Sequence, residues 1–109
     1  GGWSLDPTTW SLYAPGGTSV QLSFRERQFL RALASQPGEP VSKEMLILGL
    51  GSDPGAFDAR RLEITVRRLR KRLKEVLGVD LPILTAHGYG YALGVDVAIR
   101  RKASAAAGR

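Results

Sequence analysis

The chain has 109 residues, a length that suits one domain. Hydrophobic residues make up 43% and charged residues 24%, which is typical of a folded globular chain. The absence of cysteine excludes disulfides, thiolate metal sites and a cysteine nucleophile, and the single histidine, His87, excludes a multi-histidine metal site. Neither an apolar run of about 20 residues that would span a membrane nor a secretory signal is visible. We therefore expect no metal and no cofactor.

Basic residues are concentrated in two stretches of the chain. The formal net charge is +6, from 16 basic and 10 acidic residues. Residues 58–77 hold eight basic and three acidic residues, residues 100–109 hold four basic and no acidic ones, and the remainder is slightly acidic. Such clustering predicts a polyanionic partner, either nucleic acid or an anionic membrane surface. A solvated basic face is the simpler alternative.

Apolar and polar residues alternate over the first 24 residues, which is the pattern of half-buried strands. Residues 6–9 and 15–17 are of turn-forming types, so we expect a small antiparallel sheet of three to four strands. Trp3 and Trp10 both fall on the apolar phase, which favours core anchors over base-stacking platforms. The apolar phase comprises Trp3, Leu5, Trp10, Leu12, Ala14, Val20, Leu22 and Phe24.

A first helix is predicted to begin with a capping box, in which the side chains of Ser23 and Glu26 satisfy free backbone amides. Pro37-Gly38 ends this helix. Its buried stripe is expected to be Phe29, Leu30 and Leu33.

A second, short helix is expected over residues 43–50, after an extended link at Val41 and with Ser42 as its cap. A loop is predicted over residues 51–55 from its glycine, proline and polar content. The apolar positions of the second helix include Met45, Leu46 and Leu50.

A third helix, residues 58–77, is the most informative segment. Asp58 can cap it and Gly78 ends it. One stripe is expected to face the core and comprises Leu62, Val66, Leu69, Leu73 and Val76. The remaining surface has a flank of Arg61, Thr65, Arg68 and Arg72 and an outward face of Arg60, Ile64, Arg67 and Lys71. A buried stripe backed by an arginine face suits a helix that lies in a DNA groove.

A hairpin follows the third helix. Residues 81–85 and 89–93 are interpreted as its strands, and residues 86–88 as its turn. Strands, three helices and a hairpin in this order predict an α+β winged helix-turn-helix domain over residues 1–99. Residues 100–109 are expected to form a basic, disordered tail.

Five short motifs lie in a fixed order along the chain. They are Trp3-x-Leu5-Asp6, Leu22-x-x-x-Glu26-x-x-x-Leu30, Pro37-Gly38-x-x-Val41-Ser42, Arg67-Arg68-Leu69-Arg70-Lys71-x-Leu73 and Thr85-x-x-Gly88-x-Gly90-Tyr91. In this order and spacing they resemble the OmpR/PhoB-type DNA-binding effector domain of bacterial two-component response regulators. The resemblance covers residues 3–94.

The resemblance implies a set of partners. In that family a receiver domain is phosphorylated, dimerises and brings two effector domains onto tandem half-sites beside a promoter. The implied protein is a cytoplasmic transcription regulator that binds double-stranded DNA, self-associates through its receiver, receives phosphate from a sensor kinase and, in activators, contacts RNA polymerase. Because Met45 is the only methionine, we expect the chain to be part of a longer protein in which a receiver precedes residue 1.

The resemblance also implies roles for residues of the third helix. Arg60 resembles a residue that holds the phosphate backbone, whereas Thr65 and Arg68 match positions that reach base edges in the major groove. Arg70 is expected near phosphates or as a support of the helix. The contact residues expected on this helix are Arg60, Arg61, Ile64, Thr65, Arg67, Arg68 and Lys71. Arginine suits guanine, and an isoleucine methyl can touch a thymine methyl.

On the hairpin, Thr85 and Tyr91 match wing positions that approach the DNA backbone. His87 stands where family members often carry an arginine that enters the minor groove, and a surface turn residue with no role is the alternative. The turn of the wing, about residues 83–93, is expected to require two glycines, Gly88 and Gly90.

The sequence also leaves alternatives to a DNA-binding regulator. An enzyme is disfavoured because the acidic residues are scattered and no nucleophile has a base beside it. A basic membrane-surface or protein-interaction module would carry a basic amphipathic helix, but the stripe here is narrow and the polar face lacks aromatic residues. The same domain also occurs in larger and membrane-tethered activators. The second helix ends in Gly49-Leu50-Gly51, where the family usually has a Leu-Trp pair, so activation and repression both stay open.

Overall fold

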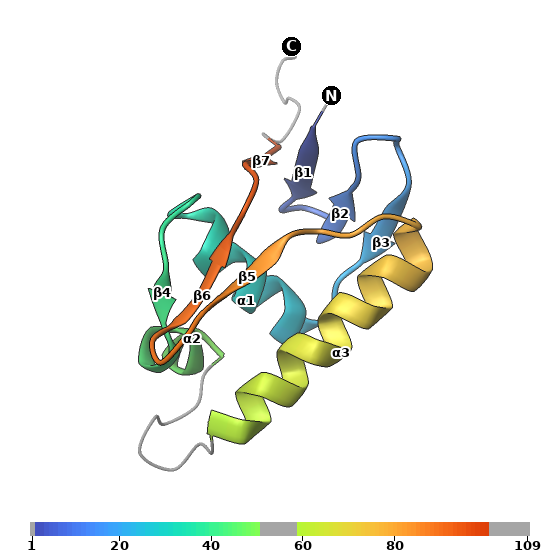
Figure 1. Cartoon of the computed structure of the whole chain (residues 1–109). Helices are drawn as coiled ribbons and strands as arrows, with labels where there is room; N and C mark the ends of the chain where they lie inside the picture. The colour runs from blue at the N-terminus through green and yellow to red at the C-terminus, as the bar shows by residue number, and fades with distance from the viewer. Residues whose placement is uncertain (1, 51–58, 101–109) are drawn as a thin grey trace.

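Two small sheets and three helices form the described part of the chain (Figure 1). The computed structural model describes residues 2–50 and 59–100. The predicted cap Asp58, the predicted loop over residues 51–55 and the tail beyond Arg100 lie outside the described residues. The elements in chain order are β1 (Trp3–Asp6), β2 (Ser11–Tyr13), β3 (Ser19–Gln21), α1 (Phe24–Ala34), β4 (Val41–Ser42), α2 (Lys43–Gly49), α3 (Ala59–Leu77), β5 (Ile83–Ala86), β6 (Gly90–Leu93) and β7 (Val97–Ile99).

The N-terminal sheet has the strand order β3-β2-β1-β7. As predicted, β1, β2 and β3 are antiparallel neighbours. The fourth strand, β7, lies parallel to β1, with Trp3 opposite Val97, so the expectation of an all-antiparallel sheet is wrong for this strand. Parallel neighbours need a long connection, and here all three helices and the hairpin provide it.

Arg100 continues the edge of this sheet, although the sequence placed it in the tail. Its amide donates a hydrogen bond to the Leu5 carbonyl at 2.8 Å, and its Nε donates to Ser4 Oγ at 3.0 Å. The guanidinium carbon lies 3.7 Å from the centroid of the Tyr13 ring, a cation–π contact. Arg100 is therefore bonded to the N-terminal sheet beyond the last residue of β7.

Of the three predicted helix caps, the two that lie in the described residues are present. Ser23 Oγ accepts the Glu26 amide at 3.3 Å while Glu26 Oε1 accepts the Ser23 amide at 2.8 Å, which completes the capping box of α1. Ser42 Oγ accepts the Met45 amide at 3.2 Å at the beginning of α2. These contacts span three residues of chain, so a local pattern is sufficient to predict them.

The buried stripe of α3 differs from the predicted one at its last position. Leu62, Val66, Leu69 and Leu73 are buried as expected, but Leu77 completes the stripe and Val76 is 50% exposed. A spacing of four, three, four and three keeps a period of 3.5 residues, which requires a supercoil. The α-helix has 3.6 residues per turn, and the buried side therefore drifts toward Leu77.

Three other apolar residues that the sequence pattern assigned to a buried side also lie outside the core. In α2, Met45 is 59% exposed, and Ile47 is buried in its place beside Leu46. Phe24 begins α1 and is exposed instead of ending a strand. Trp10 is half-buried in a turn with φ of 57°, and its ring packs at the edge of the core.

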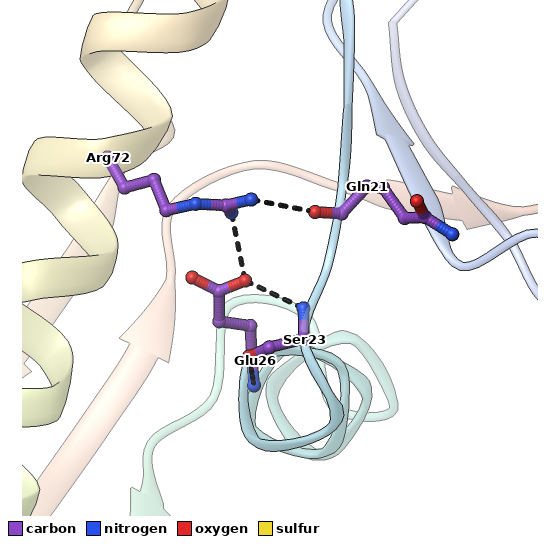
Figure 2. Close-up of polar contacts among 4 residues, drawn as sticks. All are labelled: Gln21, Ser23, Glu26 and Arg72. Atoms are coloured by element: carbon purple, nitrogen blue, oxygen red, sulfur yellow. Dashed lines mark hydrogen bonds and ion pairs between the residues drawn. The ribbon is translucent and has the colours of Figure 1, made fainter.

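An arginine of α3 joins this helix to the first turn of α1 (Figure 2). Arg72 Nη1 lies 2.9 Å from Glu26 Oε1, and Arg72 Nη2 donates to the Gln21 carbonyl at 2.9 Å. The same Glu26 oxygen accepts the Ser23 amide. One carboxylate thus closes the capping box of α1 and pairs with α3, and we call these four residues the Arg72 clasp.

The second sheet has the strand order β4-β6-β5. Gly88 turns the hairpin with φ of +76°, as a tight turn requires. The second predicted glycine has a different role: a Cβ on Gly90 would lie 1.8 Å from the Val41 carbonyl oxygen, because β4 and β6 pair at this point. Gly90 is therefore required by close packing of two strands and not by the turn.

Replacement of Gly90 by alanine should destabilise the protein by about 1–3 kcal/mol or more, because backbone atoms of Val41 must move to admit the methyl group. Urea unfolding followed by circular dichroism measures this effect. Gly49→Ala is the control, since a Cβ there meets nothing within 4 Å, and it should be neutral or stabilising. Equal stability of the two variants would contradict the packing argument.

The Glu26–Arg72 pair should show a coupling free energy of about 1 kcal/mol in a double-mutant cycle of Glu26→Gln and Arg72→Ala, since the Glu26 side chain is only 14% exposed. Glutamine retains the capping box, so the cycle reports the contact with α3. The Lys74–Asp80 pair, at 3.7 Å with both side chains more than half exposed, should give a coupling near zero. Similar couplings for the two pairs would show that the clasp adds nothing to an ordinary surface pair.

Candidate nucleic-acid interface

The side of α3 opposite its buried stripe is basic. Its 19 residues correspond to a length of about 28 Å at 1.5 Å per residue, enough to cross a DNA groove. Thr65 is half-buried, and its hydroxyl donates to the Arg61 carbonyl at 2.9 Å. The exposed residues on this side include Arg60, Arg61, Ile64, Arg67, Arg68 and Lys71, and Glu75 follows them toward the end of the helix. All seven residues predicted as contacts on the third helix are therefore on one accessible surface of α3, with Thr65 the least exposed.

Part of this surface is hollowed. A depression of about 390 Å³ is lined by four of the predicted contact residues and by Arg25, from the first turn of α1. Arg25 was not among the predicted contact residues, because no local signal in the sequence relates the first turn of α1 to α3. The lining residues are Arg25, Arg61, Ile64, Thr65 and Arg68.

Arg70 and Arg72 of α3 contact other elements of the protein. Arg72 forms the clasp with α1, and Arg70 reaches the hairpin, where its Nη2 donates to the Ile83 carbonyl and lies 3.3 Å from Thr85 Oγ1. Arg70 therefore serves as a support, one of the two roles expected of it. Its contact places the exposed Thr85 beside α3.

The wing residues selected from the sequence lie in two environments. Thr85 and His87 are exposed, His87 in the turn between β5 and β6. Tyr91 is 5% exposed, and its ring packs edge-on against Phe29 with centroids 6.0 Å apart. Burial raises the pKa of Tyr91, and Glu63 adds to this while Arg70 opposes it. The ring of Tyr91 therefore belongs to the core, where β6 packs on α1, and a contact of this residue with the DNA backbone stays a prediction.

The beginning of α3 and the turn of the wing lie at the same end of the molecule (Figure 1). The first strand β1 and the last strand β7 lie at the opposite end. The exposed basic surface of α3 and the exposed wing turn are thus presented together, away from the N-terminal sheet.

Other kinds of site were sought in the part of the chain that the structure describes. No group of three or more His, Asp or Glu side chains there could hold a metal ion. Of the helices described, none has the length and apolar character needed to cross a membrane.

The sequence is similar to known transcription regulators. Residues 17–93 match the family described as "Transcriptional regulatory protein, C terminal". The TorCAD operon transcriptional regulatory protein TorR of Escherichia coli is 35% identical over 85 residues, which are 74% of this chain and 34% of the relative. The aerobic respiration control protein ArcA of the same species is 32% identical over 91 residues, 83% of this chain and 38% of the relative. The chain thus spans little more than a third of the length of these relatives.

Solved structures share its fold. The DNA-binding domain of Klebsiella pneumoniae RstA, in complex with the RstA box, aligns with a TM-score of 0.68 at 26% identity, over 85% of this chain and 91% of that one. The DNA-binding domain of the response regulator AdeR, in complex with an intercistronic region, aligns with a TM-score of 0.72 at 22% identity, over 85% and 94% of the two chains. With its family match, its two sheets and its exposed basic helix, the chain belongs to the OmpR/PhoB-type winged helix-turn-helix family, the DNA-binding output domains of response regulators.

Proposed function

We propose that the domain binds double-stranded DNA sequence-specifically, with α3 in the major groove and the wing at the adjacent minor groove. The observation that carries this proposal is the exposed basic side of α3, opposite its buried stripe. A helix buried along one side and supported at both flanks can enter a groove as a rigid unit, and arginine forks suit guanine edges and phosphates.

The residues of α3 divide by the kind of contact that they make. Arg68 and Thr65 read base edges, with Arg61 and Ile64 beside them, and an aliphatic side chain such as Ile64 suits a thymine methyl. Arg60 binds the phosphate backbone, which carries no sequence information but positions the protein. Arg67 and Lys71 lie on the same exposed side and add phosphate contacts.

On the wing, Thr85 approaches the backbone and His87 approaches the minor groove. Both side chains are exposed. The turn of the wing lies at the same end of the molecule as the beginning of α3 (Figure 1). The ring of Tyr91 is buried, so a backbone contact by this residue would be made by its hydroxyl.

The relatives support a proposal for the wider context of the domain. We place it in a cytoplasmic response regulator whose receiver accepts phosphate from a sensor kinase, dimerises and sets two copies of this domain on tandem half-sites, with RNA polymerase as a further partner in activation. RstA and AdeR, whose domains share this fold, were solved on DNA. A domain joined before β1 would be attached at the end opposite the DNA surface (Figure 1).

Selection of bound duplexes from a randomised pool at about 0.15 M salt tests this function, because non-specific attraction is largely screened there. We expect a repeated short motif at a spacing of about 10 base pairs, one turn of DNA. Recovery of DNA without enrichment, or no recovery, would contradict sequence-specific binding by this chain.

Two variants of α3 should separate base reading from phosphate binding. Arg68→Ala should cost about 1–3 kcal/mol on the selected site and relax the preference at one base pair. Arg60→Ala should weaken binding to all sequences alike and reduce the slope of log K against log salt by about one.

Fluorescence anisotropy on the selected site and on scrambled duplexes, over a series of salt concentrations, measures both effects. Lys74→Ala is the control on the same helix, since Lys74 lies in the last turn and pairs with Asp80. Identical losses for the Arg68 and Arg60 variants on both kinds of duplex would contradict the division of roles.

A further inference from the structure

The hollow between α1 and α3 brings together cations from two helices that are far apart in sequence. Arg25 comes from the first turn of α1, and Arg61 and Arg68 come from successive turns of α3. Ile64 and Thr65 complete the lining. Three arginine residues therefore line a depression of about 390 Å³ that is open to solvent.

These three guanidinium groups have no hydrogen bond or ion pair within the part of the chain that the structure describes. The acidic residue next to Arg25 in sequence, Glu26, is already engaged by the Ser23 amide and by Arg72. Like charges gathered around one depression repel each other, and an anion bound between them relieves this repulsion.

The position of Arg25 relative to α3 is set by the Arg72 clasp. Glu26 directly follows Arg25, and its carboxylate is bonded to Arg72, about one turn along α3 from Arg68 (Figure 2). The first turn of α1 is thus held against the same flank of α3 that carries Arg61 and Arg68. The three arginines are therefore brought together by the packing of α1 against α3, and not only by the conformations of their side chains.

We infer that this hollow is a phosphate-binding subsite, in which Arg25 grips a phosphodiester of the DNA strand that borders the groove occupied by α3. The inference rests on the proposed function and adds a contact from α1 to it. Arginine binds phosphate through two parallel N–H donors, and its charge is always present. Since Arg25 lies on α1, it reaches the edge of the groove while Arg68 reads the bases within it, so its contribution is independent of sequence.

The test uses the 109-residue chain and a mixed-sequence duplex of about 30 base pairs, which reports phosphate contacts without a known operator. Arg25→Gln should reduce the slope of log K against log salt by about one, so that its loss of affinity is about 3.5-fold larger at 50 mM than at 200 mM salt. Arg25→Lys should retain the wild-type slope, since lysine also neutralises a phosphate.

Arg31→Gln is the matched control. Arg31 is an exposed arginine on the same helix, its guanidinium carbon lies 5.5 Å from the Trp10 ring centroid, and it lines a different depression. Its removal changes the net charge by the same amount, and the salt slope should stay close to that of the wild type. Thermal unfolding of each variant confirms that the fold is retained.

The outcomes separate this inference from the proposed function. If Arg25→Gln reduces the slope of log K against log salt and Arg31→Gln does not, the result supports the phosphate subsite. If Arg25→Gln behaves like Arg31→Gln while Arg61→Gln and Arg68→Gln weaken binding, the subsite is overturned and the proposed function stands. If none of the α3 variants weakens binding, the proposed function and the subsite are both overturned.

Discussion

The contact of Arg72 with Glu26 determines how the charged surface of this protein is arranged. One carboxylate oxygen accepts both the Ser23 amide and the Arg72 guanidinium, so the beginning of α1 and the middle of α3 depend on the same group. Arg72 also binds the Gln21 carbonyl, which lies at the end of β3. The crossing of α3 over α1, and with it the direction of every exposed arginine on α3, follows from this contact and from the buried stripe beneath it.

Two arginines that are two residues apart support α3 on opposite flanks. Successive residues of an α-helix are rotated by about 100°, so Arg70 and Arg72 point about 200° apart. Arg70 therefore reaches β5 of the hairpin, while Arg72 reaches α1 and β3. The helix α3 and the hairpin are thereby joined through a side chain of α3 itself.

The arginines of α3 differ in what they contact. Arg70 and Arg72 are engaged in contacts within the protein, whereas Arg68 is exposed and, together with Arg25, lines the hollow. A run rich in arginine gives the charge of a DNA-binding helix, but which arginines remain available depends on the neighbours that each one meets. We therefore base the contact set on exposure and packing and not on residue type.

Much of the fold was predictable because its determinants are local. The caps at Ser23 and Ser42 are satisfied within three residues, and the exposed basic side of α3 follows from helical periodicity. The winged order of elements and the exposure of Thr85 and His87 agree with the sequence prediction for the same reason.

Features that depend on distant partners were decided only by the tertiary structure. The parallel pairing of β7 with β1 joins residues more than 90 positions apart, and the burial of Tyr91 requires Phe29 of α1. Gly90 is needed because the Val41 carbonyl meets it, and Arg25 joins the hollow because the Arg72 clasp sets α1 against α3. Sequence alone determined which segments are helices, strands and basic surface, since hydrogen bonds and periodicity act along the chain. Contacts across the chain decided which of those surfaces meet, because packing depends on shape and distance in three dimensions.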